Sequence, residues 1–288
     1  MMGAFALLLI GAVFLFMQSR EFYRRGPQHL NPEHLSSEHG PADISFLTIR
    51  RRFDFRGIQI GQWVSEAEKQ KAAPLFFDAL LDLMTILGAT ESLISLRGTL
   101  ALQYGCGGQP GVSAHYDLAT RSFALAKNAG PGSIAHEWFH AFDHYISDKL
   151  FTATNTDTFA SRAWINDQLV LEHALNAKLE HCFQTIMLNE TLTKGSDYFK
   201  RSLAMDKKMG SDYFSQPEEL CARAFEAYVQ DAPIKNNFLV TGTLQSQEAK
   251  MGLYPQGEHR EKINDAFAQY FNHLGHVLKH QEQRLIEV

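Results

Sequence analysis

The chain has 288 residues, which is enough for one large domain or two small ones and for a sizeable apolar core. Hydrophobic residues make up 45% of it and charged residues 20%, a composition that excludes disordered and fibrous proteins. The 27 Lys and Arg against 32 Asp and Glu give a formal net charge of -5, so no nucleic-acid partner is expected. Three cysteines without a CxxC spacing argue against a disulfide framework and favour a reducing compartment.

An apolar stretch opens the chain. Residues 1–17 carry no polar side chain, and as a helix they would span about 25 Å, the lower limit for crossing a membrane. Two interpretations stay open: residues 1–19 are a membrane anchor, or they are an extension upstream of the true start. Arginines at positions 20, 24 and 25 would keep even an anchored domain in the cytosol. We therefore expect a cytoplasmic protein that meets a membrane only through residues 1–17, if these are real.

An irregular arm and a single domain are expected to follow. Residues 20–45 are rich in Pro, Gly, Ser and His and lack a periodic apolar pattern, which indicates an arm before a domain at 46–288. The domain opens with helical spacing over 65–88, where Ser65 is a candidate N-cap and Glu68 lies three residues further on.

Strands are predicted next, and helices after them. Extended segments are expected at 92–104 and at 114–127, the second broken by a turn at 117–121. Helical spacing resumes at residue 134. Further helices are predicted at 162–188, 216–231 and 259–285, with a loop over 195–210. Because strands come early and helices late, the predicted class is α+β with a small antiparallel or mixed sheet.

Residues 136–140 read His-Glu-Trp-Phe-His, the HExxH pattern. On a helix, His136 and His140 lie one turn apart on the same face and can share a zinc ion, while Glu137 borders the open metal position. Apolar residues around the motif predict a buried helix, in which polar side chains without partners would cost about 1 to 3 kcal/mol each. This pattern favours a metal ion as the partner. The alternative is a pair of core histidines hydrogen-bonded to the backbone.

A third ligand is expected from the helix predicted at 216–231. One flank of this helix carries Glu219, Ala222, Arg223 and Glu226. We expect Glu219 to complete the site with His136 and His140, since the small Ala222 lets the other helix approach. The alternative is an ion pair between Glu219 and Arg223 one turn later.

Two polar residues follow the motif on the same helix. His144 lies about 6 Å further along the helix axis than His140, and it is therefore expected outside the ligand set. Asp143 meets a similar objection, but it could orient a ligating imidazole through the ring nitrogen that does not bind metal.

Five blocks of sequence resemble the bacterial CLCA_X family, which is related to a metallopeptidase-like domain of large polyvalent proteins of mobile elements. In chain order they are RRFDFRGIQIGQWV, GTLALQYGCGG, AHYDLATRSFALAKN, GPGSIAHEWFHAFDHY and PEELCARAFEAYV. The resemblance implies a zincin-like fold of the gluzincin kind, in which a Glu on a downstream ELxAxAF-type helix completes the zinc site. That motif selects Glu219 over Glu218. The resemblance also implies a tyrosine that polarises the substrate carbonyl, with Tyr213 in a comparable place and Tyr198 as a second candidate.

The expected function is that of a zinc-dependent metallopeptidase acting on a peptide or protein substrate. Zn²⁺ would lower the pKa of a bound water, and Glu137 would serve as general base. Residues 122–127 are a candidate edge strand that could pair with an extended substrate, unless they form an internal strand. The alternative function is a catalytically silent zincin-fold binding or scaffold protein, which carries a structural metal and is associated with mobile genetic elements.

Overall fold

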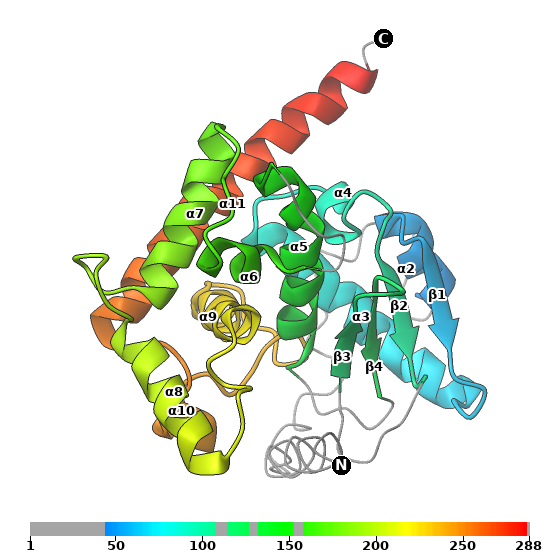
Figure 1. Ribbon diagram of the computed structural model, residues 1–288. Coiled ribbons are helices and arrows are strands. Elements are labelled where there is room, and N and C mark those ends of the chain that lie inside the picture. Colours follow the sequence, from blue (N-terminus) through cyan, green and yellow to red (C-terminus); the bar gives the residue numbers. More distant parts are fainter. Residues whose placement is uncertain (1–43, 107–113, 127–131, 153–157, 287–288) are drawn as a thin grey trace. The chain divides into compact units, whose positions relative to one another are not determined.

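The computed structural model describes residues 44–106, 114–126, 132–152 and 158–286 (Figure 1). These residues fall into two compact units. Unit 1 comprises the described parts of Met1–Thr85, Glu91–Glu137 and Asn236–Thr241, and unit 2 those of Ile86–Thr90, Trp138–Lys235 and Gly242–Val288. The single domain expected over 46–288 stays a prediction.

The predicted anchor or extension at residues 1–19 lies outside the described residues, and so does the arm at 20–45 apart from Ile44 and Ser45. Within the described part of the chain, no helix combines the length and the apolar character that a membrane span requires.

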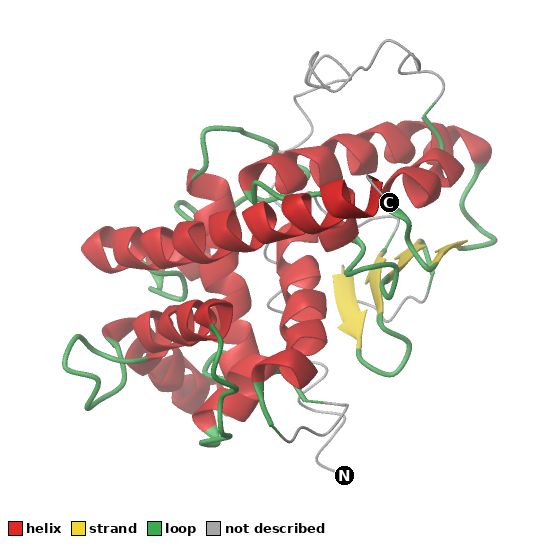
Figure 2. Cartoon of the chain, turned by 90° about the horizontal axis from the view of Figure 1, so that it is seen from above, coloured by secondary structure: helices red, strands yellow, loops and turns green. Residues whose placement is uncertain are grey.

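Unit 1 contains a four-stranded mixed sheet, drawn in yellow in Figure 2. Its strands are β1 (Gly57–Ile60), β2 (Ala101–Tyr104), β3 (Ala114–Asp117) and β4 (Ser122–Leu125). The strand order is β1-β2-β4-β3, in which β1, β2 and β4 are parallel and β3 is antiparallel to β4. The register places Ala101 beside Ser122 and Tyr116 beside Phe123. This small mixed sheet, followed by helices, confirms the predicted α+β class.

β4 is an inner strand of the sheet. It pairs with β2 on one side and with β3 on the other, and all its residues are buried. The prediction of an edge strand at 122–127 is therefore wrong, because the chain folds back and places β3 outside it. The predicted turn at 117–121 is confirmed, and Asp117 Oδ1 accepts a hydrogen bond from Ala119 N at 2.9 Å within it.

The helices of unit 1 are α2 (Phe46–Phe53), α3 (Glu66–Ile86, of which Ile86 belongs to unit 2) and α4 (Glu91–Ile94). The helix predicted over 65–88 is confirmed together with its capping box. Ser65 N donates to Glu68 Oε2 at 2.8 Å, and Glu68 N donates to Ser65 Oγ at 3.3 Å.

The extended segment predicted over 92–104 is wrong in its first half. α4 occupies the start, and the chain then turns with a positive φ of 52° at Leu96. The buried Ser95 stabilises this turn, since its Oγ accepts a hydrogen bond from Gly98 N at 3.1 Å. A compact turn thus buries apolar residues whose spacing also suits a strand, and only β2 is extended.

α5 (Ile134–Leu150) begins in unit 1 and continues in unit 2 from Trp138 on. Unit 2 also contains α6 (Ala160–Ile165), α7 (Ala174–Met187), α8 (Asp197–Met209), α9 (Pro217–Asp231), α10 (Gln247–Lys250) and α11 (Gly257–Ile286). The helices predicted from residue 134, over 216–231 and over 259–285 are confirmed.

The helix predicted over 162–188 is interrupted between α6 and α7. Leu169 O accepts a hydrogen bond from Thr152 N at 3.2 Å, and Leu171 N donates to Leu150 O at 2.8 Å. Backbone groups of Leu169 and Leu171 therefore form hydrogen bonds with the segment at the end of α5, and they are not available for the hydrogen bonds of a continuous helix.

The loop predicted over 195–210 is also wrong, since it contains α8. Ser196 begins this helix by accepting a hydrogen bond from Phe199 N at 3.1 Å, and Gly210 ends it in the left-handed region with a φ of 65°. The two glycines that suggested a loop lie at the ends of a helix instead.

Aromatic rings fill the core of unit 2. The rings of Trp138 and Phe139 on α5 lie 5.5 and 4.9 Å from the ring of Phe225 on α9. Phe267 and Phe271 of α11 pack on the same Phe225 ring, at 5.7 and 5.6 Å. Since these rings are fully buried, the apolar contact fixes α5 and α9 side by side.

Candidate metal centre

The first turn of α5 is held by residues 236–241, which follow α9 in the chain. Gly132 N donates to Phe238 O and Ala135 N donates to Leu239 O, each at 3.1 Å. The bond from Ala135 satisfies a backbone donor that the start of a helix leaves without a partner inside the helix, and the bond from Gly132 fixes the chain just before it. Gly132 has a φ of 105°, and a Cβ there would lie 2.4 Å from a side-chain atom of the segment, so the contact requires glycine.

Asn236 ties this segment to α3. Its side-chain oxygen accepts hydrogen bonds from Phe238 N at 2.9 Å and Leu239 N at 3.1 Å. Its side-chain nitrogen donates to Asp82 at 2.8 Å and to Asp78 at 3.3 Å, and both aspartates are buried. Sequence reasoning missed this network, because it joins distant parts of the chain and no local motif marks it.

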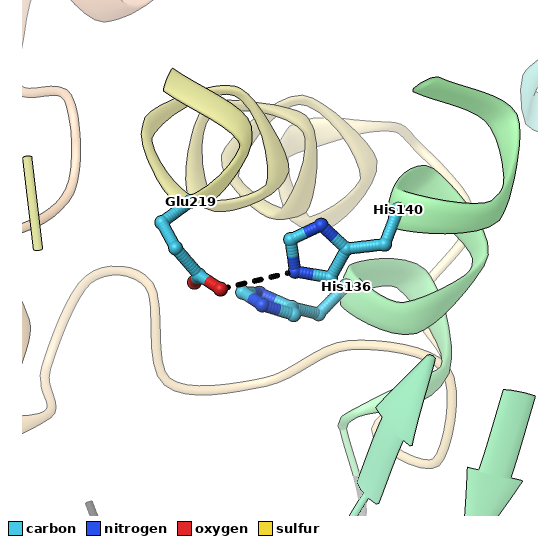
Figure 3. Close-up of side chains that lie close together, drawn as sticks. All are labelled: His136, His140 and Glu219. Atoms are coloured by element: carbon cyan, nitrogen blue, oxygen red, sulfur yellow. Dashed lines mark ion pairs between the residues drawn. The ribbon is translucent and has the colours of Figure 1, made fainter. Parts of the chain in front are cut away.

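The structure brings together the three side chains that were expected to bind a metal. His136 and His140 extend from α5 toward Glu219 on α9 (Figure 3). One ligand atom from each residue can be chosen such that all lie within 4.8 Å of one another. His140 Nε2 lies 3.3 Å from Glu219 Oε1, and these two residues are only 6% and 9% exposed.

This donor set fits zinc. Two imidazoles and one carboxylate are typical of sites that keep a position open for water or substrate. With bonds of about 2.1 Å and tetrahedral angles, ligand atoms lie roughly 3.4 Å apart. The 3.3 Å between His140 and Glu219 meets this requirement. The other separations are at most 4.8 Å, so they would have to close by no more than about 1.4 Å, which side-chain rotation can supply.

Glu137, the expected general base, follows His136 directly and is 5% exposed. It lies in the first turn of α5, where the positive end of the helix dipole favours a carboxylate. A buried carboxylate next to a candidate ligand suits a group that handles protons in a site from which most water is excluded. Its role as base stays a prediction.

The neighbouring carboxylates Glu218 and Glu219 take different partners, although both are buried. Glu218 forms an ion pair with Arg162 of α6, whose Nε lies 3.2 Å from Glu218 Oε2. Glu219 lies beside His140 instead. The structure thus brings Glu219, and not Glu218, to the two histidines, in agreement with the choice made from the sequence.

The alternative reading of Glu219, an ion pair with Arg223, is wrong. Arg223 is buried and uses its guanidinium elsewhere. It donates to Phe214 O and, from Nε at 3.3 Å, to the Tyr198 hydroxyl. Arg223 therefore acts on Glu219 through its charge at a distance and leaves the carboxylate facing the imidazole.

Asp143 is fully buried one turn after His140. Its Oδ1 accepts a hydrogen bond from Ser161 N at 2.9 Å, and its Oδ2 accepts one from Ser161 Oγ at 2.5 Å. Burial raises the pKa of Asp143 to about 7; the nearby Glu218 raises it as well, while the Ser161 hydrogen bonds and His140 lower it. Both carboxylate oxygens of Asp143 thus accept hydrogen bonds from Ser161, and its suggested role in orienting a ligating imidazole stays a prediction.

His144 is buried beside Phe159, with ring centroids 6.1 Å apart, and it does not belong to the group of ligand atoms. This agrees with its expected place outside the ligand set.

The two candidate tyrosines lie in different surroundings. Tyr198 is fully buried, donates its hydroxyl to Leu220 O at 3.1 Å, and has a pKa raised by burial to about 12. Its hydroxyl also accepts the hydrogen bond from Arg223 Nε, so it is held within the core between these two partners. Tyr213 lies half-buried just before α9, with its ring 5.3 Å from the Phe214 ring. Its role at a substrate carbonyl stays a prediction.

Comparison with known proteins relates part of the chain to a family. The family described as large polyvalent protein-associated domain 1 matches residues 205–278, about a quarter of the chain. The matched region runs from within α8 into α11 and includes Glu219, but not His136 or His140. No curated protein and no solved structure matches the chain. The family match supports a relation to large polyvalent proteins.

Proposed function

We propose that this protein is a zinc-dependent metallopeptidase. The observation that carries the proposal is the approach of Glu219 on α9 to the HExxH histidines on α5, with His140 Nε2 and Glu219 Oε1 3.3 Å apart. HExxH sequences arise by chance, but chance does not supply a buried carboxylate from another helix at ligand distance. His136, His140 and Glu219 would hold the ion and leave a coordination position open.

The proposed chemistry needs little beyond these residues. A zinc ion supplies Lewis acidity, which polarises a carbonyl and acidifies water. Glu137 accepts the proton of the attacking water on its carboxylate and delivers it to the leaving amine. Tyr213 donates a hydrogen bond to the charge that develops on the carbonyl oxygen.

The fold around the motif supports the same proposal. A mixed sheet precedes the HExxH helix in the chain, as the resemblance to CLCA_X and the zincin-like fold would require. Within the described sheet, the outer side of β3 pairs with no other strand. An extended peptide could add there by backbone hydrogen bonds, a mode that does not depend on particular side chains.

The match to large polyvalent protein-associated domain 1 favours a second candidate function. The matched segment includes the Glu219 helix without the HExxH helix, so the family relation does not depend on catalysis. Under this alternative the chain is a binding or scaffold protein of the zincin kind, associated with mobile genetic elements, and its metal braces α5 against α9.

Replacing Glu137 with Gln separates the two functions. Under the peptidase proposal, Glu137→Gln lowers kcat/KM on a library of internally quenched peptides by about 100- to 10,000-fold, since proton transfer is lost while the ligands remain. Zinc content stays unchanged. The exposed Glu172→Gln serves as the matched control and keeps full activity.

If repurified Glu137→Gln still cleaved the peptides, the proposed mechanism would be contradicted. Zinc bound equally by wild type and variant, with no cleavage by either, would instead select the scaffold function.

A further inference from the structure

We infer that the four residues Phe159–Arg162, called here the bridge, set the separation of the two ligand-bearing helices, and that Ser161 and Arg162 are positioning residues for the metal centre. The inference rests on the proposed metal site. It does not rest on peptidase activity. All its contacts lie within unit 2.

The first arm of the bridge reaches α5. Ser161 is completely buried, and its backbone N–H and hydroxyl bind the two carboxylate oxygens of Asp143, at 2.9 and 2.5 Å. Asp143 lies three residues after His140, so this contact acts within one helical turn of a candidate ligand. A two-point contact between buried groups fixes orientation as well as distance.

The second arm reaches α9. The Arg162 guanidinium contacts both carboxylate oxygens of Glu218, and its terminal nitrogen also donates to Gln216 Oε1 at 3.0 Å. Glu218 is only 5% exposed and directly precedes Glu219. A two-point Arg–carboxylate contact of this kind has a defined geometry, unlike a flexible surface ion pair.

The two arms start from consecutive residues, whose Cα atoms are about 3.8 Å apart. One short element thus ties Asp143 on α5 to Glu218 on α9, so a shift of either carboxylate disturbs a contact of this element. Phe159 adds a third contact, because its ring lies 5.6 Å from the imidazole of His140. Since zinc tolerates ligand distances only within about 0.2 Å, a device that fixes the interhelical distance should affect metal affinity.

The test measures metal binding by the full-length chain. Zinc affinity is determined by chelator competition for wild type, Ser161→Ala and Arg162→Gln, and the ligand field is followed by the visible spectrum of bound Co²⁺. We expect each variant to bind zinc about 10-fold more weakly than wild type and to alter the Co²⁺ bands, as for residues that orient metal ligands from outside the coordination sphere.

Two matched controls report purely structural losses in unit 2. Ser196→Ala removes a buried hydroxyl that bonds Ile186 O at 2.8 Å, and Lys262→Gln removes ion pairs with Glu190 and Glu258. Ser196→Ala is expected to lower stability and Lys262→Gln to cost little, because its ion pairs are exposed. Neither variant is expected to change zinc affinity or the Co²⁺ spectrum. Bridge variants that bind zinc no worse than these controls would overturn the inference.

The double variant Ser161→Ala/Arg162→Gln tests most directly whether the two arms act as one unit. If both arms belong to one bridge, breaking the second arm adds little, and the double variant binds about as weakly as either single one. Independent losses that multiply to roughly 100-fold would contradict the bridge. A wild-type chain that binds neither zinc nor Co²⁺ would also overturn it, whereas loss of peptidase activity with metal still bound would count only against the proposed function.

Discussion

The two helices that carry the candidate ligands share the aromatic contact around Phe225 but differ in the other contacts that hold them. α5 is held in unit 2 by aromatic packing, in which the buried ring of Trp138 contacts Phe142, Phe225 and Phe271. α9 is buried from Glu218 to Val229, although it carries charged residues along this length. Each of these has a specific partner: Arg162 for Glu218, His140 for Glu219, Phe214 O and Tyr198 for Arg223, and Tyr254 for Glu226.

This difference has a consequence for how each helix tolerates change. Apolar packing depends on volume and shape, so α5 should respond to cavities. Polar tethers depend on individual donors and acceptors, so α9 should respond to the loss of a single hydrogen bond that leaves a buried group without its partner. The ligand pair His140–Glu219 joins the two helices, with His140 Nε2 and Glu219 Oε1 3.3 Å apart.

The largest effect on stability is expected from α5. Trp138→Ala should lower the free energy of unfolding by about 3 to 5 kcal/mol, because it leaves a cavity among fully buried rings. Urea denaturation of metal-free protein measures it. Leu169→Ala, at a side chain 72% exposed, is the control and should cost less than about 0.5 kcal/mol. A cost near that of the control would show that the aromatic cluster does not support α5.

A smaller effect is expected from α9. Arg223→Met keeps most of the side-chain volume but removes the donors to Phe214 O and Tyr198, and should cost about 1 to 3 kcal/mol in the same assay. Equal losses in the free energy of unfolding for Arg223→Met and Trp138→Ala would contradict the proposed difference between the helices. A neutral Arg223→Met would mean that the polar tethers do not stabilise α9.

The ligands could be predicted from the sequence because their signals are local. His136 and His140 are one helical turn apart by their spacing alone, and the apolar residues around them predict burial. Glu219 is separated from them by many residues, and its choice over Glu218 came from the resemblance to a motif. The structure agrees with that choice through Arg162, which takes Glu218.

The supporting residues could not be predicted in the same way. Ser161 and Arg162 lie in a stretch that was expected to start a long helix, and the interruption depends on backbone bonds to the end of α5. A buried Glu218 implies a cationic partner, but the sequence does not indicate which of the 27 Lys and Arg supplies it. Asn236 likewise acquires its role only when a distant loop meets α3.

The central claim is that His136, His140 and Glu219 hold one zinc ion, and equilibrium zinc binding tests it most directly. The measurement compares wild type with Glu219→Gln by chelator competition. Both carry His280→Gln, because His276 and His280 are exposed on α11 with rings 4.3 Å apart and could retain a second ion. The account predicts one tightly bound zinc per chain and at least a 10-fold weaker affinity in Glu219→Gln. The account would be contradicted if the wild type bound less than half an equivalent of zinc, or if Glu219→Gln bound zinc as tightly as the wild type.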